Sequence, residues 1–462
     1  MEVEFITHKG ASRLILVFAG WSMDARPFGS LLRDGYDIAV VWDYRDCCID
    51  WTFALPYTEI CIVAWSLGVY AAATSTAAIE SRVTRRIAVN GTISPVDDSL
   101  GIPEAIFRGT LDGLDERNLL KFYRRMAGSK QAYEAFMAVR PDRDIESLRS
   151  ELDAFCRLPE PDFGPVTRWD VAVIGRADAI FPPANQTRAW ASTATEILDA
   201  PHLVDLQAVI DRHIVDKDRM GQRFARGRKS YDDFAPVQAE CVDRLCSMMH
   251  DNSIDAVISR PGARVLEIGC GTGTLSRRLA RLRGADTTLE LWDIVGPAPV
   301  ECEGVTFRQV DAETEIMRLD SESVDVIASA STVQWFNSPS RFFTECARVL
   351  VPGGYLALTT FVSGNLQEVA DATGRSLPLP DRDGWLAMTD GLLDVIGCEC
   401  YERCMLFDQP LDVFRHLKST GVNSLDSSDS HSLRSAAKRL RADDDGRYRA
   451  TYRPIILLMK KK

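Results

Sequence analysis

The sequence has no long apolar run and no excess of positive charge. Although 46% of its 462 residues are hydrophobic, the longest apolar runs, at 14–19 and 455–459, are far shorter than the roughly 20 residues of a membrane-spanning helix. The formal net charge is −12, whereas general nucleic-acid binding requires a basic surface. The sequence therefore predicts a globular protein that binds neither membranes nor nucleic acids.

Signs of secretion and of metal binding are also missing. The first residues, Met1-Glu-Val-Glu, carry acids instead of the basic segment of a secretory signal, and twelve cysteines are too few for a disulfide scaffold in this chain. We therefore expect a cytoplasmic protein. The cluster Cys398, Cys400 and Cys404 matches no common zinc spacing, so we expect no metal site and predict that these residues lie in a strand as small apolar residues.

The length predicts more than one domain, because a single hydrophobic core rarely grows beyond about 250–300 residues. In the first part of the chain, runs rich in β-branched residues alternate with helical stretches such as 66–79. The predicted buried parallel strands are 14–19, 38–42, 60–64, 87–90, 171–174 and 196–198. The strand pattern is missing from 95 to 161, where helical patterns at 116–126 and 132–139 predict a helical lid inserted in an α/β sheet.

A polar, basic stretch at 216–231 predicts a linker followed by a helix, after which strands and helices alternate again. The predicted strands of this second part are 265–268, 288–292, 306–310, 324–329, 355–360, 399–407 and 452–459. We place the domain boundary near residue 215, which divides the chain into α/β domains at 1–215 and 216–462.

Ser66 lies in the pattern Ala-Trp-Ser66-Leu-Gly, between a predicted strand and a predicted helix. An esterase holds its nucleophile on such a sharp turn, and small residues two positions before and after the serine permit it. Here these residues are Ala64, in place of the usual glycine, and Gly68. The alternative is that Ser66 is only the N-cap of the following helix.

Asp178 and His202 follow Ser66 in the order in which the acid and the histidine follow the nucleophile of α/β-hydrolases. Each comes after a predicted strand, so both are expected at the same edge of the sheet as Ser66. Asp178 would then orient the imidazole of His202, which takes the proton of Ser66. His213, on the next helix, is the local rival of His202.

Such a hydrolase also needs backbone N–H groups that face the negative charge of the tetrahedral intermediate. We expect one from Leu67, directly after the serine, and one from Trp21, after the first long strand. Gly20 permits the close backbone approach at that point.

Several segments of the first half are distinctive in combination. They are Phe18-Ala-Gly-Trp-Ser-Met-Asp, Ala64-Trp-Ser-Leu-Gly-Val, Asn90-Gly-Thr-Ile-Ser-Pro-Val-Asp and Phe122-Tyr-Arg-Arg-Met. Through them this half resembles, over nearly its full length, the pimeloyl-[acyl-carrier-protein] methyl ester esterases of biotin synthesis. The resemblance implies a serine esterase that hydrolyses a methyl ester on an acyl carrier protein.

The second half contains Glu267-Ile-Gly-Cys-Gly-Thr-Gly, which follows a predicted strand and opens a helix. Gly269, Gly271 and Gly273 let the backbone approach a cofactor without a Cβ clash. Residue 274 is Thr, where a dinucleotide-binding loop would have glycine, and Glu267 before the loop is typical of methyltransferases. The loop therefore predicts binding of S-adenosylmethionine.

Two carboxylates end the next predicted strands. Asp293 would accept hydrogen bonds from both ribose hydroxyls, and Asp311, followed by Ala312, would receive the adenine amino group. Acids at strand ends are often only helix caps, but here they occur in the order and at the intervals of a methyltransferase. The second half is therefore expected to have a Rossmann-like methyltransferase fold.

Further segments of this half are Tyr231-Asp-Asp-Phe-Ala-Pro-Val-Gln, Ser331-Thr-Val-Gln-Trp-Phe and His416-Leu-Lys-Ser-Thr-Gly-Val-Asn. With the glycine loop, they make this half resemble the malonyl-[acyl-carrier-protein] O-methyltransferases of biotin synthesis nearly end to end. The resemblance implies that Tyr231 closes over the cofactor and that Gln334 and Trp335 lie on the substrate side. No general base is expected, because a malonyl carboxylate is ionised at neutral pH and can attack the methyl group directly.

Both resemblances imply an acyl carrier protein as partner, bearing malonyl and pimeloyl methyl ester groups. Such carriers are strongly acidic, so docking on an acidic chain needs local basic patches. The predicted patches are Lys121, Arg124 and Arg125 on the lid, and Arg223, Arg226, Arg228 and Lys229 before the methyltransferase domain. Such charges are as often only solvated helix faces.

Two other functions fit the same residues. The chain could be a small-molecule methyltransferase fused to a degenerate hydrolase-like scaffold domain, although the intact Ser66, Asp178 and His202 argue against this. It could also join a methyltransferase to an unrelated hydrolase that acts on free small molecules.

Overall fold

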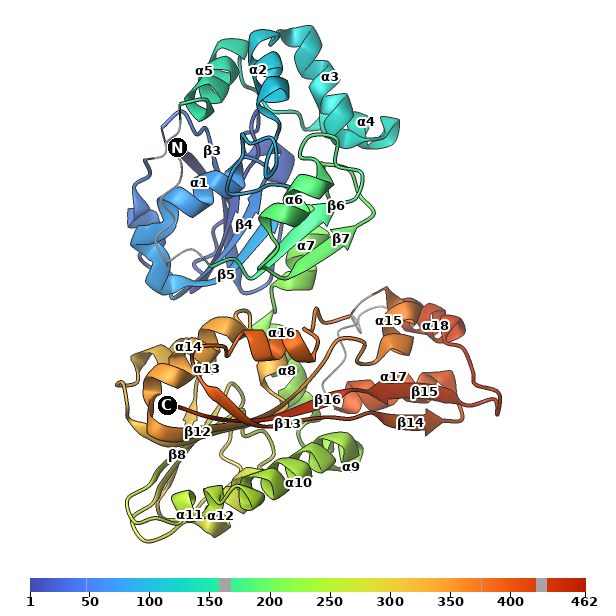
Figure 1. Ribbon diagram of the computed structural model, residues 1–462. Helices are drawn as coiled ribbons and strands as arrows, with labels where there is room; N and C mark the ends of the chain where they lie inside the picture. Colours follow the sequence, from blue (N-terminus) through green and yellow to red (C-terminus); the bar gives the residue numbers. More distant parts are fainter. Residues whose placement is uncertain (47, 158–167, 375, 421–429) are drawn as a thin grey trace. The chain divides into compact units, whose positions relative to one another are not determined.

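The computed structural model describes residues 1–46, 48–157, 168–374, 376–420 and 430–462. It divides into two compact units, Met1–Ile214 and Val215–Lys462, and each contains a seven-stranded sheet (Figure 1). None of the described helices has the length and apolar character that crossing a bilayer requires.

The sheet of the first unit is parallel except at one edge. Its strands are β1 Glu2–Thr7, β2 Arg13–Phe18, β3 Tyr36–Trp42, β4 Glu59–Trp65, β5 Val83–Val89, β6 Val171–Gly175 and β7 Thr195–Leu198, in the order β1-β3-β2-β4-β5-β6-β7. The strands β2 to β6 are almost wholly buried and mostly apolar, as expected for a parallel sheet covered on both faces, and β5 also contains Thr84, Arg85 and Arg86. Strand β1, which pairs antiparallel with β3, was not predicted from the sequence, because its alternating acids and apolar residues form a partly exposed edge strand.

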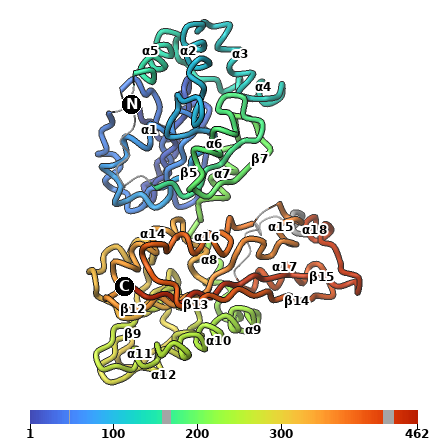
Figure 2. Tube along the Cα trace, viewed as in Figure 1, coloured from blue at the N-terminus to red at the C-terminus, as the bar shows by residue number. Residues whose placement is uncertain are grey.

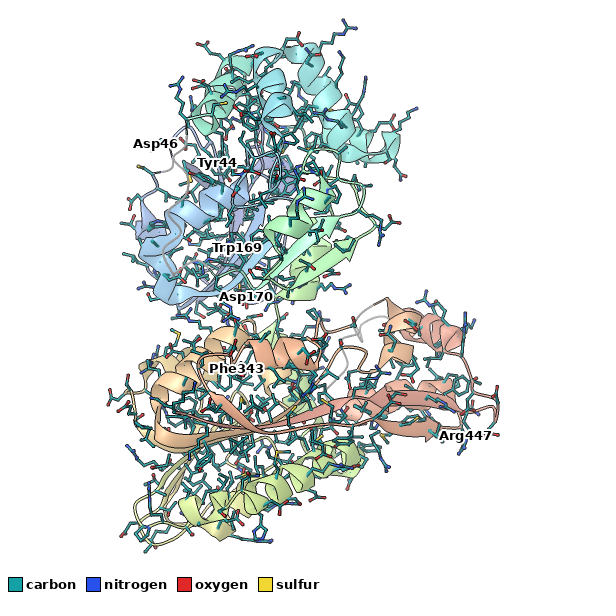
Figure 3. The ribbon with its side chains drawn as sticks, in the orientation of Figure 1. Tyr44, Asp46, Trp169, Asp170, Phe343 and Arg447 are labelled. Carbon is teal, nitrogen blue, oxygen red and sulfur yellow. The ribbon has the colours of Figure 1, made fainter. Side chains whose placement is uncertain are left out.

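Helices α1 Gly68–Ser75, α6 Pro183–Ala189 and α7 Leu206–His213 accompany the parallel strands, with 3₁₀ turns at Arg26–Phe28, Trp51–Ala54 and Thr76–Arg82. Between β5 and β6 the chain forms the helices α2 Glu104–Asp112, α3 Glu116–Ala127, α4 Lys130–Ala138 and α5 Ile145–Phe155. These helices gather at one end of the unit (Figure 1), and Asp170, which precedes β6, lies at the other end (Figure 3). They therefore lie on the side of the carboxyl ends of the strands. The end of the predicted lid, 158–161, lies outside the described residues.

The sheet of the second unit has the strands β8 Arg264–Ile268, β9 Thr288–Asp293, β10 Val305–Gln309, β11 Val324–Ala330, β12 Leu350–Phe361, β13 Asp394–Cys400 and β16 Pro454–Lys460. Their order is β10-β9-β8-β11-β12-β16-β13. The last strand, β16, runs antiparallel between β12 and β13, and the colours of Figure 2 show the end of the chain inserted there. The order reverses between β8 and β11, and α/β sheets bind ligands outside the carboxyl ends of their strands at such a point.

Two strand predictions in this unit were wrong in extent. The predicted strand 399–407 belongs to two strands in different sheets, β13 and β14 Arg403–Phe407. The predicted strand 452–459 likewise begins in β15 Tyr448–Tyr452, which pairs with β14, and continues as β16. Pro454 has no N–H for a ladder hydrogen bond, and the chain changes sheets just before it. Cys398 is half-buried in β13, but Cys400 and Cys404 are exposed, so these two are not core residues.

Helices cover both faces of the second sheet (Figure 1). One hydrophobic cluster joins it to α10 Pro236–Asp251, α11 Ile254–Ile258 and α12 Ser276–Leu282, and another joins it to α13 Ala312–Glu315, α14 Pro339–Val349 and α16 Arg382–Ala387. A third cluster holds the two-stranded β14–β15 sheet against α15 Gln367–Thr373, α17 Pro410–Ser419 and α18 Ser430–Arg439. The remaining helices are α8 Lys217–Gly227 and α9 Tyr231–Phe234.

Candidate active sites

In the first unit, Ser66 lies on a sharp turn between β4 and α1. Its φ of 59° is in the left-handed region, and its N–H donates to the carbonyl of Val89 at 2.9 Å. A Cβ at residue 68 would lie 2.4 Å from the carbonyl oxygen of Phe18, so the turn requires glycine there. The N-cap position of α1 is Leu67, and no side chain caps this helix. The hydroxyl of Ser66 therefore does not cap the helix.

That hydroxyl lies 3.0 Å from Nε2 of His202. The other ring nitrogen, Nδ1, lies 3.0 and 2.9 Å from the two carboxylate oxygens of Asp178. Asp178 also accepts hydrogen bonds from the N–H groups of Ile180 and Phe181 at 2.8 and 3.0 Å. The structure therefore brings together a serine, a histidine and an acid in the arrangement in which the imidazole can take the hydroxyl proton.

His213, the rival histidine, belongs to a different cluster. Its Nε2 lies 2.8 Å from Glu196, and burial lowers its pKa. Glu196 belongs to β7, so this contact does not connect His213 to Ser66.

The two predicted oxyanion donors lie beside the serine turn. No hydrogen bond links the backbone N–H of Trp21 or of Leu67 to another described residue. A Cβ at residue 20 would approach the Cβ of Ser66 to 3.1 Å, so Gly20 lets the loop after β2 pass close to the serine. The strand order of this sheet reverses between β2 and β4, which places this loop and Ser66 at the point where such sheets bind ligands.

A cavity of about 450 Å³ opens between Trp21 and the helices α2 and α3. Phe122 lines it and meets Trp21 edge-on, with ring centroids 5.0 Å apart. The predicted basic residues Lys121 and Arg125 line it as well. Arg124 does not: its guanidinium lies over the ring of Tyr133, 5.1 Å from the centroid.

In the second unit, the glycine loop follows β8. Gly269, Gly271 and Gly273 have φ values of 72°, 51° and 90°. A Cβ at residue 269 would lie 2.0 Å from Oγ1 of Thr332, and one at residue 273 would lie 2.6 Å from Cβ of Pro299. Larger residues would therefore break the loop.

Asp293, at the end of β9, holds this loop in place. Its two carboxylate oxygens accept hydrogen bonds from the N–H groups of Gly271 and Val295, both at 2.7 Å. Burial raises its pKa. Asp293 thus shapes the loop in addition to the role in ribose binding that the sequence predicts.

A cavity of about 360 Å³ lies beside the loop. The predicted residues that line it are Tyr231, Glu267, Gly269, Gly271, Asp293, Asp311, Ala312 and Trp335. Gly273 and Gln334 are not among its lining residues; the amide of Gln334 donates to the carbonyl of Ser331 at 2.6 Å and accepts from Oγ1 of Thr360 at 3.1 Å.

Glu267 lies at the cavity and is 1% exposed. Burial raises its pKa to about 8. Its Oε2 has no hydrogen-bond partner among the described residues. An unpaired buried carboxylate oxygen is costly, so this atom is suited to a donor brought by a ligand.

Lys217, the first residue of α8, belongs to this site although it was not predicted from the sequence. Its ammonium group is buried at the cavity, 2.7 Å from Asp311 and 2.5 Å from Glu313. From the same helix, Phe224 contacts the ring of Trp335 at a centroid distance of 5.8 Å. The polar, basic composition of 216–231 indicated a linker, and no local signal marked Lys217 as a residue of the site.

Of the predicted basic residues 223, 226, 228 and 229, one is among the lining residues of this cavity. Arg228 lines the cavity and donates to the carbonyl oxygens of Val295 and Pro297 at 3.3 and 2.6 Å. The end of the segment 416–423 lies outside the described residues from 421 onward. Within the part of the chain that the structure describes, no three His, Cys, Asp or Glu side chains are placed to hold a metal ion.

The second unit's reversed strand order, glycine loop and strand-end carboxylates define a Rossmann-like methyltransferase, and the model of the family "Methyltransferase domain" matches residues 266–358. The model of "Pimeloyl-ACP methyl esterase BioG" matches residues 1–207. A malonyl-[acyl-carrier protein] O-methyltransferase of Bacteroides fragilis is 36% identical over 467 aligned residues, which cover 97% of this chain and 93% of that protein. The chain belongs to the family of this malonyl-[acyl-carrier protein] O-methyltransferase.

Relatives of the separate halves also exist. A malonyl-[acyl-carrier protein] O-methyltransferase of Haemophilus influenzae is 34% identical over 46% of this chain and 79% of its own length. The crystal structure of BioG from the same organism is 35% identical, covers 44% of this chain and 94% of its own, and has a TM-score of 0.41. The predicted combination of an esterase-family half and a methyltransferase-family half is confirmed.

Proposed function

We propose that the chain is a bifunctional enzyme of biotin biosynthesis. The second unit methylates the free carboxylate of malonyl-acyl carrier protein, and the first hydrolyses pimeloyl-acyl carrier protein methyl ester to pimeloyl-acyl carrier protein and methanol. The first unit is then an α/β-hydrolase domain, with α2 to α5 as its lid. The observation that carries the esterase half is the 3.0 Å approach of the Ser66 hydroxyl to His202.

In the hydrolysis, His202 takes the proton of Ser66 while the serine oxygen attacks the ester carbonyl carbon. The N–H groups of Trp21 and Leu67 stabilise the negative oxygen of the tetrahedral intermediate. His202 then gives the proton to the departing methoxide, and methanol leaves. Water, deprotonated by the same histidine, releases the carboxylic acid and restores the serine.

S-adenosylmethionine, when bound, supplies an electrophilic methyl group. The cavity fits it: the glycine loop allows a close backbone approach, and the unpaired Oε2 of Glu267 can accept a hydrogen bond from its ammonium group. Asp293 would hold the ribose and Asp311 the adenine end. The protein orients the malonyl carboxylate, which is ionised at neutral pH and needs no general base.

The two reactions complement each other. A free carboxylate at the end of a growing acyl chain is costly to bury in the apolar channels of fatty-acid synthesis. Methylation removes this charge, and hydrolysis restores it once the chain is complete. The malonyl group is shorter than the pimeloyl group, and each missing methylene weakens binding in an apolar pocket by about 0.8 kcal/mol. An esterase pocket that fits the pimeloyl group would therefore bind the malonyl ester less well by about 3 kcal/mol. This difference limits futile cycling.

The cavity beside Trp21 supports an acyl entrance on the lid. Trp21, Phe122, Ile106 and Leu114 provide apolar walls, and Lys121 and Arg125 add positive charge for an acidic carrier.

The test is an assay of the purified chain with two carriers. Malonyl-acyl carrier protein with S-adenosylmethionine should gain a methyl group, and pimeloyl-acyl carrier protein methyl ester should lose one, both followed by mass spectrometry. Reaction with a fluorophosphonate would exclude the degenerate-scaffold alternative. Equal turnover of carrier-bound and free small esters would favour the alternative of an unrelated hydrolase.

A further inference from the structure

Asn90 follows β5 directly and is 1% exposed, with a φ of 45°. Its segment is among those that make this half distinctive, yet the proposed chemistry does not use it. We propose that Asn90 is a positioning residue of the esterase site, because its side chain joins the loop of Asp178 to the loop of His202. This inference rests on the proposed hydrolase function of the first unit.

The amide of Asn90 makes three hydrogen bonds to backbone groups. Its Nδ2 donates to the carbonyl oxygens of Pro201 and His202 at 3.0 and 2.9 Å. Its Oδ1 accepts from the N–H of Gly175 at 2.6 Å. Two acceptors and one donor admit a single orientation of the amide, so the assignment of its oxygen and nitrogen is settled by its partners.

These partners belong to the loops that carry the acid and the histidine. Gly175 ends β6 just before Asp178, and the carbonyl of His202 belongs to the histidine itself. The same carbonyl accepts a second hydrogen bond from the indole N–H of Trp65 at 3.0 Å. The backbone of His202 is therefore held by donors from β4 and from the end of β5.

Asn90 also fixes the position of both loops relative to Ser66. The N–H of Ser66 donates to Val89 at 2.9 Å, and a Cβ at residue 91 would lie 2.2 Å from the carbonyl oxygen of Ser66. The backbone at 89–91 thus touches the serine turn on one side, while the side chain of Asn90 reaches the other two loops.

Direct backbone hydrogen bonds also link the acid and histidine loops, from Arg176 to Leu198 and from Ala177 to Ala200, at 2.8 and 3.0 Å. These bonds extend the pairing of β6 with β7 and make no contact with the serine turn. Without Asn90, the carbonyl of His202 keeps the hydrogen bond from the indole of Trp65 but loses the one from the amide, and we expect the pair of loops to shift together relative to Ser66. A shift of about 1 Å in a reacting group can lower the rate about 10²-fold.

Asn90→Asp and Asn90→Ala test this role. The aspartate has the same shape but puts an oxygen against two carbonyl oxygens, so it removes the donor without leaving a cavity. Asn185→Ala is the matched control: Asn185 is 5% exposed, and its amide donates to the carbonyl oxygens of Asp98 and Gly101 at 3.0 and 2.8 Å.

We expect both Asn90 variants to lower kcat for pimeloyl-acyl carrier protein methyl ester about 10²-fold, with KM within twofold of wild type. Their reaction with a fluorophosphonate should slow by a similar factor, while methyl transfer by the same chain stays unchanged. Asn185→Ala should lower the melting temperature without a comparable loss of kcat.

The proposal is overturned if the Asn90 variants lose no more turnover than Asn185→Ala, or if KM rises while kcat holds. Failure of the proposed function looks different, because the wild-type chain would then neither hydrolyse the ester nor react with the phosphonate. That result would remove the role of Asn90 together with the esterase.

Discussion

The two sites differ in what their polar groups are bonded to. In the first unit, the ring nitrogens of His202 form hydrogen bonds with Ser66 and Asp178 at 2.9 to 3.0 Å. In the second, Oε2 of Glu267 and Oγ of Ser331 are buried beside the cavity without a partner among the described residues. The proposed hydrolysis uses the protein's own atoms, which must be assembled in advance, whereas methyl transfer relies on a cofactor that supplies the missing partners.

Replacing Ser66 should have the largest effect, and it should affect one of the two sites only. Ser66→Ala should lower hydrolysis of the pimeloyl ester by about 10⁴-fold or more, because no other group forms the covalent intermediate. Methyl transfer to malonyl-acyl carrier protein should stay near wild type, since its cavity lies in the other unit. Parallel assays on one preparation measure both activities, and an equal loss of both in a folded variant would refute independent sites.

Asp293→Ala should weaken binding of S-adenosylmethionine by about 1.5–3 kcal/mol through lost hydrogen bonds to a charged group. The loop should also loosen, because Gly271 and Val295 lose their acceptor. Calorimetric titration gives the affinity. Hydrolysis serves as the internal control, and an unchanged affinity would place the ribose contact elsewhere.

The unpaired Oε2 of Glu267 predicts that cofactor binding is linked to a proton. Since burial raises the pKa of Glu267 to about 8, the carboxyl is mostly protonated at pH 7, and pairing with an ammonium group favours its ionised form. Binding of S-adenosylmethionine at pH 7 should therefore release a proton from Glu267.

The proton release can be measured by calorimetry in buffers of different ionisation enthalpy. Glu267→Gln has no proton to lose at this position, so its binding should be weaker and should release fewer protons at pH 7 than binding by the wild-type chain. Buffer-independent binding by the wild-type chain would show that Glu267 does not receive the ammonium group.

The smallest effect is expected at the lid. Reversing charge with Lys121→Glu and Arg125→Glu should raise KM for the carrier-bound ester several-fold, more at low salt than at high salt. Turnover of a small soluble ester should hardly change. Arg124→Glu is the control, because Arg124 packs over Tyr133 instead of lining the cavity; an equal effect of all three reversals would indicate general charge repulsion.

The sequence alone determined the elements that depend on neighbouring residues. Runs of buried apolar residues predicted the inner strands of both sheets. The small residues Ala64 and Gly68 around Ser66 and the glycines after Glu267 indicated sharp turns, because a turn conformation is a local property. The order of Ser66, Asp178 and His202, each after a strand, predicted that they meet at one sheet edge. Strand pairing could not be predicted in this way, so the edge strand β1 and the division of 399–407 into two strands became visible only in the fold.

The tertiary structure decided which distant groups touch. Lys217 reads as part of a basic linker, and only packing brings its ammonium group against Asp311. Asn90 ends the predicted strand 87–90, and only the fold places its amide between Gly175 and His202. The physical reason is that a side-chain hydrogen bond depends on three-dimensional position over a few ångströms, whereas composition and periodicity describe only residues close together along the chain.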